Sequence, residues 1–253
     1  MRMLSIALLV ALWALPALAG ETWKTDMVWP SPAMRATGIA WDGRYLWHGE
    51  SGGPGTLYKT DPKTGRVLSS VQTQMSDPGD IEWLNGAIWA TEENRINGDH
   101  WVVKIDPRSG ATLQKVKVVT PDNVSDGQCE AVATDGNLLY VSWHGRWIIK
   151  IDPATGETVD KMEVGWANPD LTGNAYYLDG LAWAFGHLFA VTNTPLAIVE
   201  LDPRTGRKLA EFKAPAGEGW GPEGLATDGT SLYYAENTTN RYYRITLIDG
   251  YFR

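Results

Sequence analysis

Asp61-Pro-Lys-Thr-Gly65 is one of four copies of a five-residue turn, and these copies decide the fold of the chain. The other three are Asp106-Pro-Arg-Ser-Gly110, Asp152-Pro-Ala-Thr-Gly156 and Asp202-Pro-Arg-Thr-Gly206. In such a turn proline fixes one backbone angle, and glycine adopts a conformation that other residues avoid. Copies that recur about every 45 to 50 residues, between short apolar and alternating runs, predict a β-propeller with one four-stranded sheet per repeat.

A second repeated unit combines an apolar inner strand with a tight turn, and it occurs five times. The copies are residues 37–43, 79–86, 130–136, 179–186 and 223–229. Three of the turns are Asp-Gly, which is a strong hairpin signal. Five copies predict five blades. Tryptophans at repeated strand positions are expected in the core between blades; they are Trp41, Trp83, Trp89 and Trp183.

The last repeat is one strand short of the others. It reaches only a third strand, at residues 242–247, whereas residues 22–29 alternate like an outer strand and stand just before the first inner strand. We expect this N-terminal strand to complete the last blade, because ring closure covers a strand edge that would otherwise be exposed. The predicted fold is an all-β, five-bladed β-propeller.

The beginning of the chain has the pattern of a secretory signal peptide. Arg2 precedes an apolar stretch at residues 4–15, and the small residues Ala17 and Ala19 follow it. The apolar stretch is too short to anchor the protein in a bilayer. We therefore expect residues 1–19 to be a signal peptide and residues 20–253 to be a single domain. The mature protein is expected to be secreted or periplasmic, monomeric and without a membrane anchor.

Charge and cysteine content narrow the classes of partner. The formal net charge is −8 at pH 7 and the basic residues are scattered, which disfavours nucleic acid as a partner. Cys129 is the single cysteine, so the chain forms no internal disulfide. No glycine-rich phosphate loop and no zinc-ligand spacing occurs in the sequence, and we expect no organic cofactor.

Chemistry is expected at the mouth of the central channel, where loops before the inner strands and after the second strands open on one face. Acidic residues stand at or beside the starts of four inner strands: Asp80, Glu130, Asp179 and Glu223. The ends of the second strands supply the expected ligand-binding residues, which are His48, Glu50, Glu92, Trp143, His144, Asn193, Glu236 and Asn237. A small molecule or a peptide N-terminus is the expected partner.

Carboxylates that converge on one point repel one another. Either a cation compensates their charge, or some of them keep a proton because their pKa is raised. Calcium takes about six to eight oxygen ligands, so Glu130, Asp179 and Glu223 are candidate Ca²⁺ ligands. A carboxyl with a raised pKa suits general acid–base catalysis, for which Asp80 and Glu130 are the candidates. The alternative is that the loops carry these groups into solvent.

Two further residues, Cys129 and His144, stand at the ends of one predicted hairpin. Their placement makes a Cys–His nucleophile conceivable. A lone cysteine at the start of a strand is more often a small packed residue. We therefore give this pair less weight than the carboxylates.

The whole predicted mature chain resembles the five-bladed glutaminyl cyclases of plant and bacterial type. The resemblance rests on Gly43-Arg-Tyr-Leu-Trp-His-Gly-Glu-Ser51, on residues 57–68, on Ala133-Thr-Asp-Gly136 and on the closing strands at residues 233–247. It implies that an N-terminal glutamine cyclises and releases ammonia. A glutamate in a Gly-Glu-Gly-Leu motif is central to catalysis in that family, and Gly79-Asp80-Ile81 matches the motif here with a shorter carboxylate.

Two inner-strand segments, Asp179-Gly-Leu-Ala182 and Pro222-Glu-Gly-Leu-Ala226, are similar to the calcium-dependent lactonase and gluconolactonase propellers. Those families have six blades and use such positions to hold a central metal. Streptogramin-lyase-type propellers, with seven blades, are similar at a lower level. Three functions therefore stay open: a glutaminyl cyclase-like enzyme, a calcium-supported lactonase- or lyase-like enzyme, and a non-catalytic binding or scaffold propeller.

Overall fold

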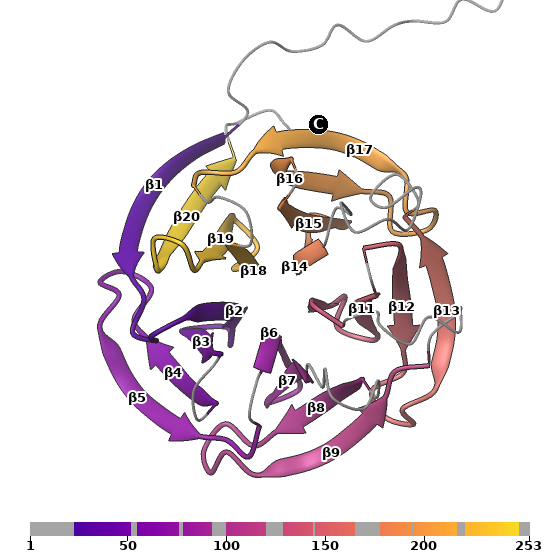
Figure 1. Ribbon diagram of the computed structural model, residues 1–253, viewed down its shortest axis with the longest axis horizontal. Coiled ribbons are helices and arrows are strands. Elements are labelled where there is room, and N and C mark those ends of the chain that lie inside the picture. The colour runs from indigo at the N-terminus through magenta and orange to yellow at the C-terminus, as the bar shows by residue number, and fades with distance from the viewer. Residues whose placement is uncertain are drawn as a thin grey trace, which may run out of the picture.

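A computed structural model describes residues 23–51, 55–75, 78–92, 100–119, 129–143, 145–164, 178–193, 195–216 and 221–247. Within these ranges the chain forms β-strands and no helix, arranged as five antiparallel four-stranded sheets around a central axis (Figure 1). The described part of the chain offers no helical segment with the length and apolarity needed to traverse a lipid bilayer. The predicted five-bladed propeller is confirmed. The predicted signal peptide lies outside the described residues.

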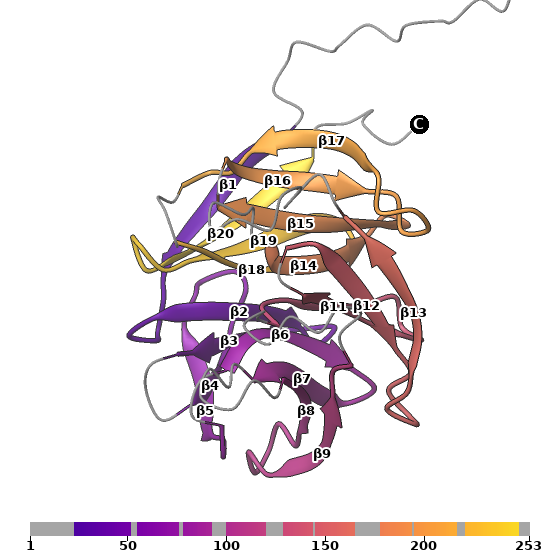
Figure 2. The same ribbon diagram turned by 45° about the vertical axis from the view of Figure 1, so that its right-hand side comes forward.

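Each blade runs from an inner strand beside the axis to an outer strand at the circumference, as the tilted view of β14 to β17 shows (Figure 2). Blade 1 consists of β2 (Ala36–Trp41), β3 (Leu46–Glu50), β4 (Thr56–Thr60) and β5 (Val67–Gln72). Blade 2 consists of β6 (Pro78–Leu84), β7 (Ala87–Glu92), β8 (Trp101–Ile105) and β9 (Thr112–Lys117). Blade 3 consists of β10 (Val132–Thr134), β11 (Leu139–Trp143), β12 (Trp147–Ile151) and β13 (Thr158–Glu163). Blade 4 consists of β14 (Leu178–Ala184), β15 (His187–Asn193), β16 (Leu196–Leu201) and β17 (Lys208–Lys213).

Blade 5 is closed by the N-terminal strand, as the sequence predicts. It contains β18 (Pro222–Thr227), β19 (Ser231–Glu236) and β20 (Arg241–Leu247), and β1 (Trp23–Pro30) pairs antiparallel with β20 as its outer strand (Figure 1). Arg244 on β20 forms a salt bridge of 2.8 Å with Asp26 on β1. Because the two ends of the chain share one sheet, the ring cannot open without breaking this strand pair.

The four Asp-Pro turns join each third strand to its outer strand and also touch the blade before it. The Gly65 amide donates to the Asp61 carbonyl at 2.8 Å, and Gly65 has a φ of +69°. A Cβ atom on Gly65 would lie 2.3 Å from the Trp29 ring on β1. A Cβ atom on Gly110 would lie 1.9 Å from the Gln72 carbonyl oxygen on β5. Glycine is therefore required twice over, for its backbone angle and for the contact between blades.

The Asp-Gly turns between the inner and second strands are built around the aspartate side chain. Asp42 accepts main-chain N–H groups from Arg44 at 2.9 Å and Tyr45 at 2.7 Å, and the Trp47 indole N–H at 2.9 Å. Asp135 with Tyr140 and Asp228 with Tyr233 repeat this arrangement, the tyrosine hydroxyl replacing the indole. These turns are larger than the two-residue turn that Asp-Gly favours.

The predicted tryptophan positions are confirmed as contacts between blades. Trp41 stacks on Tyr233 of blade 5 with ring centroids 6.1 Å apart, and Trp83 stacks on Trp47 of blade 1 at 6.2 Å. Trp183 of blade 4 meets Tyr140 of blade 3 at 5.2 Å. Trp89 is buried in the core shared by blades 2 and 3. Aromatic pairs of this kind hold neighbouring sheets in register.

We expect Gly65→Ala to destabilise the protein more than Gly136→Ala. Both glycines have a positive φ, so both substitutions cost about 1 kcal/mol through the backbone. A Cβ atom on Gly136 meets nothing within 4 Å, whereas one on Gly65 collides with Trp29. The collision should cost about 1 to 3 kcal/mol more. Urea unfolding of both variants measures the difference, and equal losses would show that the turn does not press on β1.

Candidate functional site

The inner strands of blades 1, 2, 4 and 5 approach one another so closely at the axis that backbone packs on backbone. A Cβ atom on Gly38 of blade 1 would lie 2.2 Å from the Ile81 nitrogen of blade 2. A Cβ atom on Gly180 of blade 4 would lie 2.6 Å from Gly224 Cα of blade 5. We call this region the hub. Side chains larger than hydrogen have no room at these positions.

Asp80 places its carboxylate inside the hub and is only 1 % exposed. One oxygen accepts the Ile81 N–H at 2.9 Å. The other accepts N–H groups from Val132 of blade 3 at 3.3 Å and Leu181 of blade 4 at 3.2 Å. Burial raises the pKa of Asp80 well above its usual range, although these three amides favour the charged form. Asp80 thus joins three blades at the axis.

Glu130, the second predicted catalytic residue, lies beside Asp80 on the neighbouring blade. The Asp80 N–H donates to the Glu130 carbonyl oxygen at 3.1 Å, and the Thr91 hydroxyl donates to the same oxygen at 3.1 Å. Two residues along β6, Glu82 accepts the Thr134 N–H at 3.2 Å, and burial raises the pKa of Glu82 to about 8. The structure therefore brings the main chain of Glu130 against Asp80, and it adds Glu82, a carboxyl that the sequence analysis missed.

A group of acidic side chains surrounds Tyr234 at the junction of blades 4 and 5. Burial raises the pKa of Tyr234, and the negative charges of Glu236, Asp179 and Glu223 raise it further. Glu236 is buried and accepts the main-chain N–H groups of Thr238 and Thr239, at 2.6 and 2.8 Å. Pro222 pairs with Glu236, so the start of β18 and the end of β19 meet at the edge of the ring that carries these acidic side chains.

The remaining predicted residues of this edge extend the acidic group into blade 1. Glu223 accepts a hydrogen bond from the Asn237 side-chain amide. Glu50, at the end of β3, is buried and accepts the Met34 N–H at 2.9 Å. Burial raises the pKa of Tyr242, and the charges of Glu50 and Glu223 add to this rise. We call Glu50, Asp179, Glu223 and Glu236 the acidic rim.

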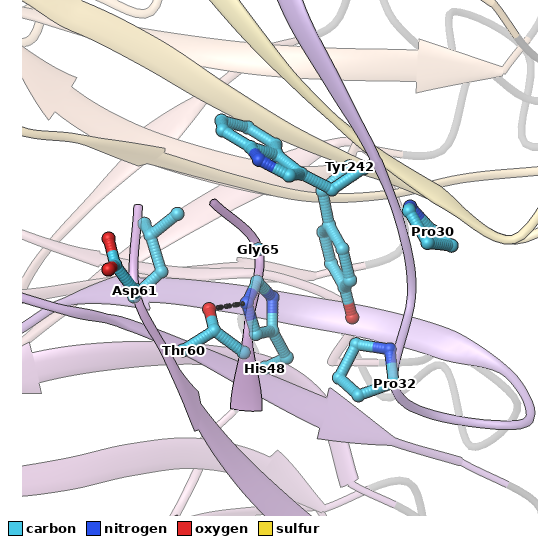
Figure 3. Close-up of a pocket in the computed structure, with 9 residues that line it drawn as sticks. Pro30, Pro32, His48, Thr60, Asp61, Gly65 and Tyr242 are labelled. Atoms are coloured by element: carbon cyan, nitrogen blue, oxygen red, sulfur yellow. Dashed lines mark hydrogen bonds between the residues drawn. The ribbon is translucent and has the colours of Figure 1, made fainter. Parts of the chain in front are cut away.

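His48 lies deeper, between blades 1 and 5, beside a small cavity (Figure 3). Its Nε2 atom is 2.6 Å from the Thr60 hydroxyl, and its ring centroid is 3.8 Å from that of Tyr242. The cavity has a volume of about 10 Å³, which is room for one water molecule. Burial lowers the pKa of His48 to about 3, so the ring is neutral at physiological pH.

Of the other predicted residues, Glu92 and Trp143 lie away from the acidic rim, and Asn193 lies next to it, because the end of β15 pairs with the start of β14. Glu92 forms a salt bridge of 2.5 Å with Lys115 of its own blade. Trp143 is buried in the core of blades 2 and 3, with its ring edge against His100, and Cys129 is buried in the same core. Asn193 is buried at the end of β15. His144, and with it the Cys129–His144 pair, falls outside the described residues.

Within the described ranges, no three His, Cys, Asp or Glu side chains are grouped so that they could hold a metal ion. The predicted trio is divided between two places. Asp179 and Glu223 lie in the acidic rim near Tyr234, and Glu130 lies at the seam between blades 2 and 3. Calcium binding stays a prediction.

The fold and this arrangement of side chains define a five-bladed β-propeller with an acidic edge. No protein-family model and no curated protein matches the chain. The crystal structure of Myxococcus xanthus glutaminyl cyclase is similar, with a TM-score of 0.62 and 15 % identity over 90 % of this chain and 97 % of that one. The resemblance in fold to a bacterial glutaminyl cyclase is thereby confirmed.

Two other solved structures are similar in fold. The β-propeller domain of Cps50 (Swd1) from Myceliophteria thermophila has a TM-score of 0.53 and 11 % identity over 89 % of this chain and 100 % of that one. A luciferin-regenerating enzyme has a TM-score of 0.53 and 12 % identity over 88 % of this chain and 96 % of that one. Likenesses at these identities show the architecture alone.

The stability of the wild type and of Asp80→Asn should depend differently on pH, because only the wild type has the buried carboxyl. The folded-state pKa of Asp80 lies above its unfolded value of about 3.9, so the folded protein holds a proton that the unfolded chain releases. This contribution to stability is complete below pH 4 and is lost as the pH rises toward the folded-state pKa. Urea unfolding should therefore show a wild-type advantage that shrinks from pH 4 to pH 7. An advantage that grows would mean that the three amide donors outweigh burial.

Proposed function

We propose that the protein binds the amino terminus of a peptide, or a similar small amine, at the acidic rim and acts as a glutaminyl cyclase-like enzyme. The observation that supports the proposal is that buried carboxyl side chains of three blades stand at the same edge: Glu50 at the end of β3, Asp179 at the start of β14 and Glu236 at the end of β19. Carboxylates gathered at one edge of the ring favour a positively charged partner. An ammonium group meets this requirement and donates hydrogen bonds to carboxylates.

The hydrogen bonds within the acidic rim support a prepared site. Glu50 and Glu236 are held by main-chain N–H groups, which fix the carboxylates without neutralising their charge. Tyr58 donates from its hydroxyl to Glu50 at 3.4 Å. A ligand with an ammonium group would supply the missing positive charge, and little rearrangement of these side chains would be needed.

Cyclisation requires a proton to be moved between two nitrogens. The bound ammonium group first gives one proton to a carboxylate of the acidic rim, which returns it to solvent. The neutral α-amino nitrogen then attacks the side-chain amide carbon of the N-terminal glutamine, the bond from that carbon to its nitrogen breaks, and ammonia leaves. The proton released by the attacking nitrogen passes to the leaving nitrogen, and Glu130 is the proposed carrier. Asp80 positions Glu130 through its N–H bond to the Glu130 carbonyl oxygen. The raised pKa of Asp80 also suits it to exchange protons.

Export belongs to the same proposal. The pattern of residues 1–19 supports secretion or delivery to the periplasm, where peptides with free amino termini are available as substrates.

Purified protein should release ammonia from a peptide with N-terminal glutamine, and it should leave the same peptide unchanged when the amino terminus is acetylated. Glu223→Gln should raise KM at least about tenfold by weakening ammonium binding. Glu130→Gln should lower kcat by about 100-fold, as expected for loss of a general acid–base group, with little change in KM.

The control for both substitutions is Glu157→Gln. Glu157 is an exposed carboxylate in the Asp152 turn, far along the blade from the inner strands. This variant should keep wild-type kinetics. Absence of ammonia release by the wild type would remove the cyclase proposal, and an equal loss in the Glu157 variant would remove the acidic rim as the binding site.

Calcium is the alternative cation for the acidic rim, because Asp179 and Glu223 offer the oxygen ligands that it prefers. If calcium binds there, the melting temperature should rise with millimolar CaCl₂ and fall again with a chelator, since binding to the folded state alone raises stability. Asp179→Asn should abolish the rise, whereas Asp160→Asn on the outer strand β13 should leave it intact. An unchanged melting temperature would contradict a calcium-supported lactonase- or lyase-like function.

A further inference from the structure

A groove lies between blades 1 and 2 at the opposite end of the strands from the acidic rim. Glu50 ends β3, whereas the turn that contains Asp42 and Tyr45 precedes β3. The groove has a volume of about 540 Å³, within the range of small-molecule sites. It is lined by side chains of both blades, from the turn between β2 and β3 to the Asp106 turn.

Positive charge dominates the lining of this groove, although the chain as a whole has a net charge of −8. Three basic side chains line it, Arg44, Lys59 and Arg108, against the single carboxylate of Asp42. The Lys59 ammonium forms a salt bridge of 2.8 Å with Asp42. Over the residues that the structure describes, neither Arg44 nor Arg108 has a carboxylate within salt-bridge distance.

Local hydrogen bonds explain why the nearby aspartates leave the two arginines available. Asp42 already accepts two turn N–H groups, the Trp47 indole N–H and the Lys59 ammonium. Asp106 turns its carboxylate toward the main-chain N–H groups of Arg108 and Ser109, at 2.7 and 3.3 Å. The guanidinium groups of Arg44 and Arg108 therefore have their donors free for an anion.

Aromatic rings form the apolar part of the groove. Trp47 is 4 % exposed and stacks on the half-buried Trp83, with 16° between the ring planes. The Lys59 ammonium lies 4.4 Å from the centroid of the Tyr45 ring, and the Arg44 guanidinium lies 5.0 Å from the same centroid. These contacts fix the rings and the cations relative to one another. A ligand ring in the groove can lie against the half-buried Trp83 while its charge faces the arginines.

We propose that this groove is a second binding site, for a small molecule that carries a carboxylate on a ring. The guanidinium groups of Arg44 and Arg108 bind the carboxylate, and the aromatic residues contact the ring. The ring can belong to a sugar acid or to an aromatic acid, because the C–H groups on one face of a sugar ring and the face of an aromatic ring both pack against aromatic side chains. The site is independent of the acidic rim, which lies at the other end of the strands and favours cations.

Saturation-transfer NMR and calorimetric titration test this site with glucuronate and benzoate as probes, and with glucose and benzamide as their uncharged counterparts. At least one of the two acids should bind more tightly than its uncharged counterpart, and raising the salt concentration should weaken binding. The double substitution Arg44→Gln with Arg108→Gln should raise the Kd at least about tenfold.

The matched control is Arg204→Gln. Arg204 occupies the position in the Asp202 turn of blade 4 that Arg108 occupies in the Asp106 turn, and both side chains are exposed. This variant should bind the acids as the wild type does. The double variant should also keep wild-type ammonia release, which separates this site from the acidic rim. Three results would each overturn the proposal: no binding of either acid, equal binding of the uncharged counterparts, or an equal loss in the Arg204 variant.

Discussion

The close approach of the inner strands at the hub is the constraint on which the rest of the structure depends. Gly38, Gly180 and Gly224 let strands of four blades meet backbone to backbone. Strands that meet in this way cannot form a continuous sheet, so some of their N–H groups need another acceptor. Asp80 supplies it, since its carboxylate accepts N–H groups from three blades. The carboxyl group is buried because the geometry of the ring requires an acceptor at that point.

At the circumference the ring is closed by the Asp-Pro turns and by the pairing of β1 with β20. Together with the contacts at the hub, they explain how a chain without an internal disulfide keeps its ring closed. Each Asp-Pro turn presses its glycine against the preceding blade, as Gly65 does against Trp29. The pairing of β1 with β20 joins the two ends of the chain. Hydrophobic clusters fill the space between hub and circumference, and each cluster draws on neighbouring blades.

The architecture could be predicted from the sequence because every blade repeats the same turn and strand motifs. The site depends on distances between blades, which these motifs do not specify. Counting turns gives the blade number, and repeated strand positions identify Trp41, Trp83 and Trp183 as contacts between blades. Alternation along β6 indicates that Asp80 and Glu82 share a face. It cannot show that the amides of Val132 and Leu181 reach the Asp80 carboxylate. Likewise, Trp143 ends its strand like a surface residue, and only the packing of His100 against it reveals a buried position.

The filled hub also separates the two proposed sites, the acidic rim and the groove between blades 1 and 2. In a ring with an open channel, one ligand can be touched from both faces. Here backbone atoms and the Asp80 carboxylate occupy the axis where the strands meet. The acidic rim and the groove lined by Arg44, Lys59 and Arg108 are at opposite ends of the strands. In the two proposals the rim favours a positively charged ligand, and the groove favours a negatively charged one. On the two proposals above, a molecule that carries both an ammonium and a carboxylate group would meet an attractive site on either face. Blade 1 would then contribute to both sites, because Glu50 lies at one end of β3 and Arg44 precedes the other end.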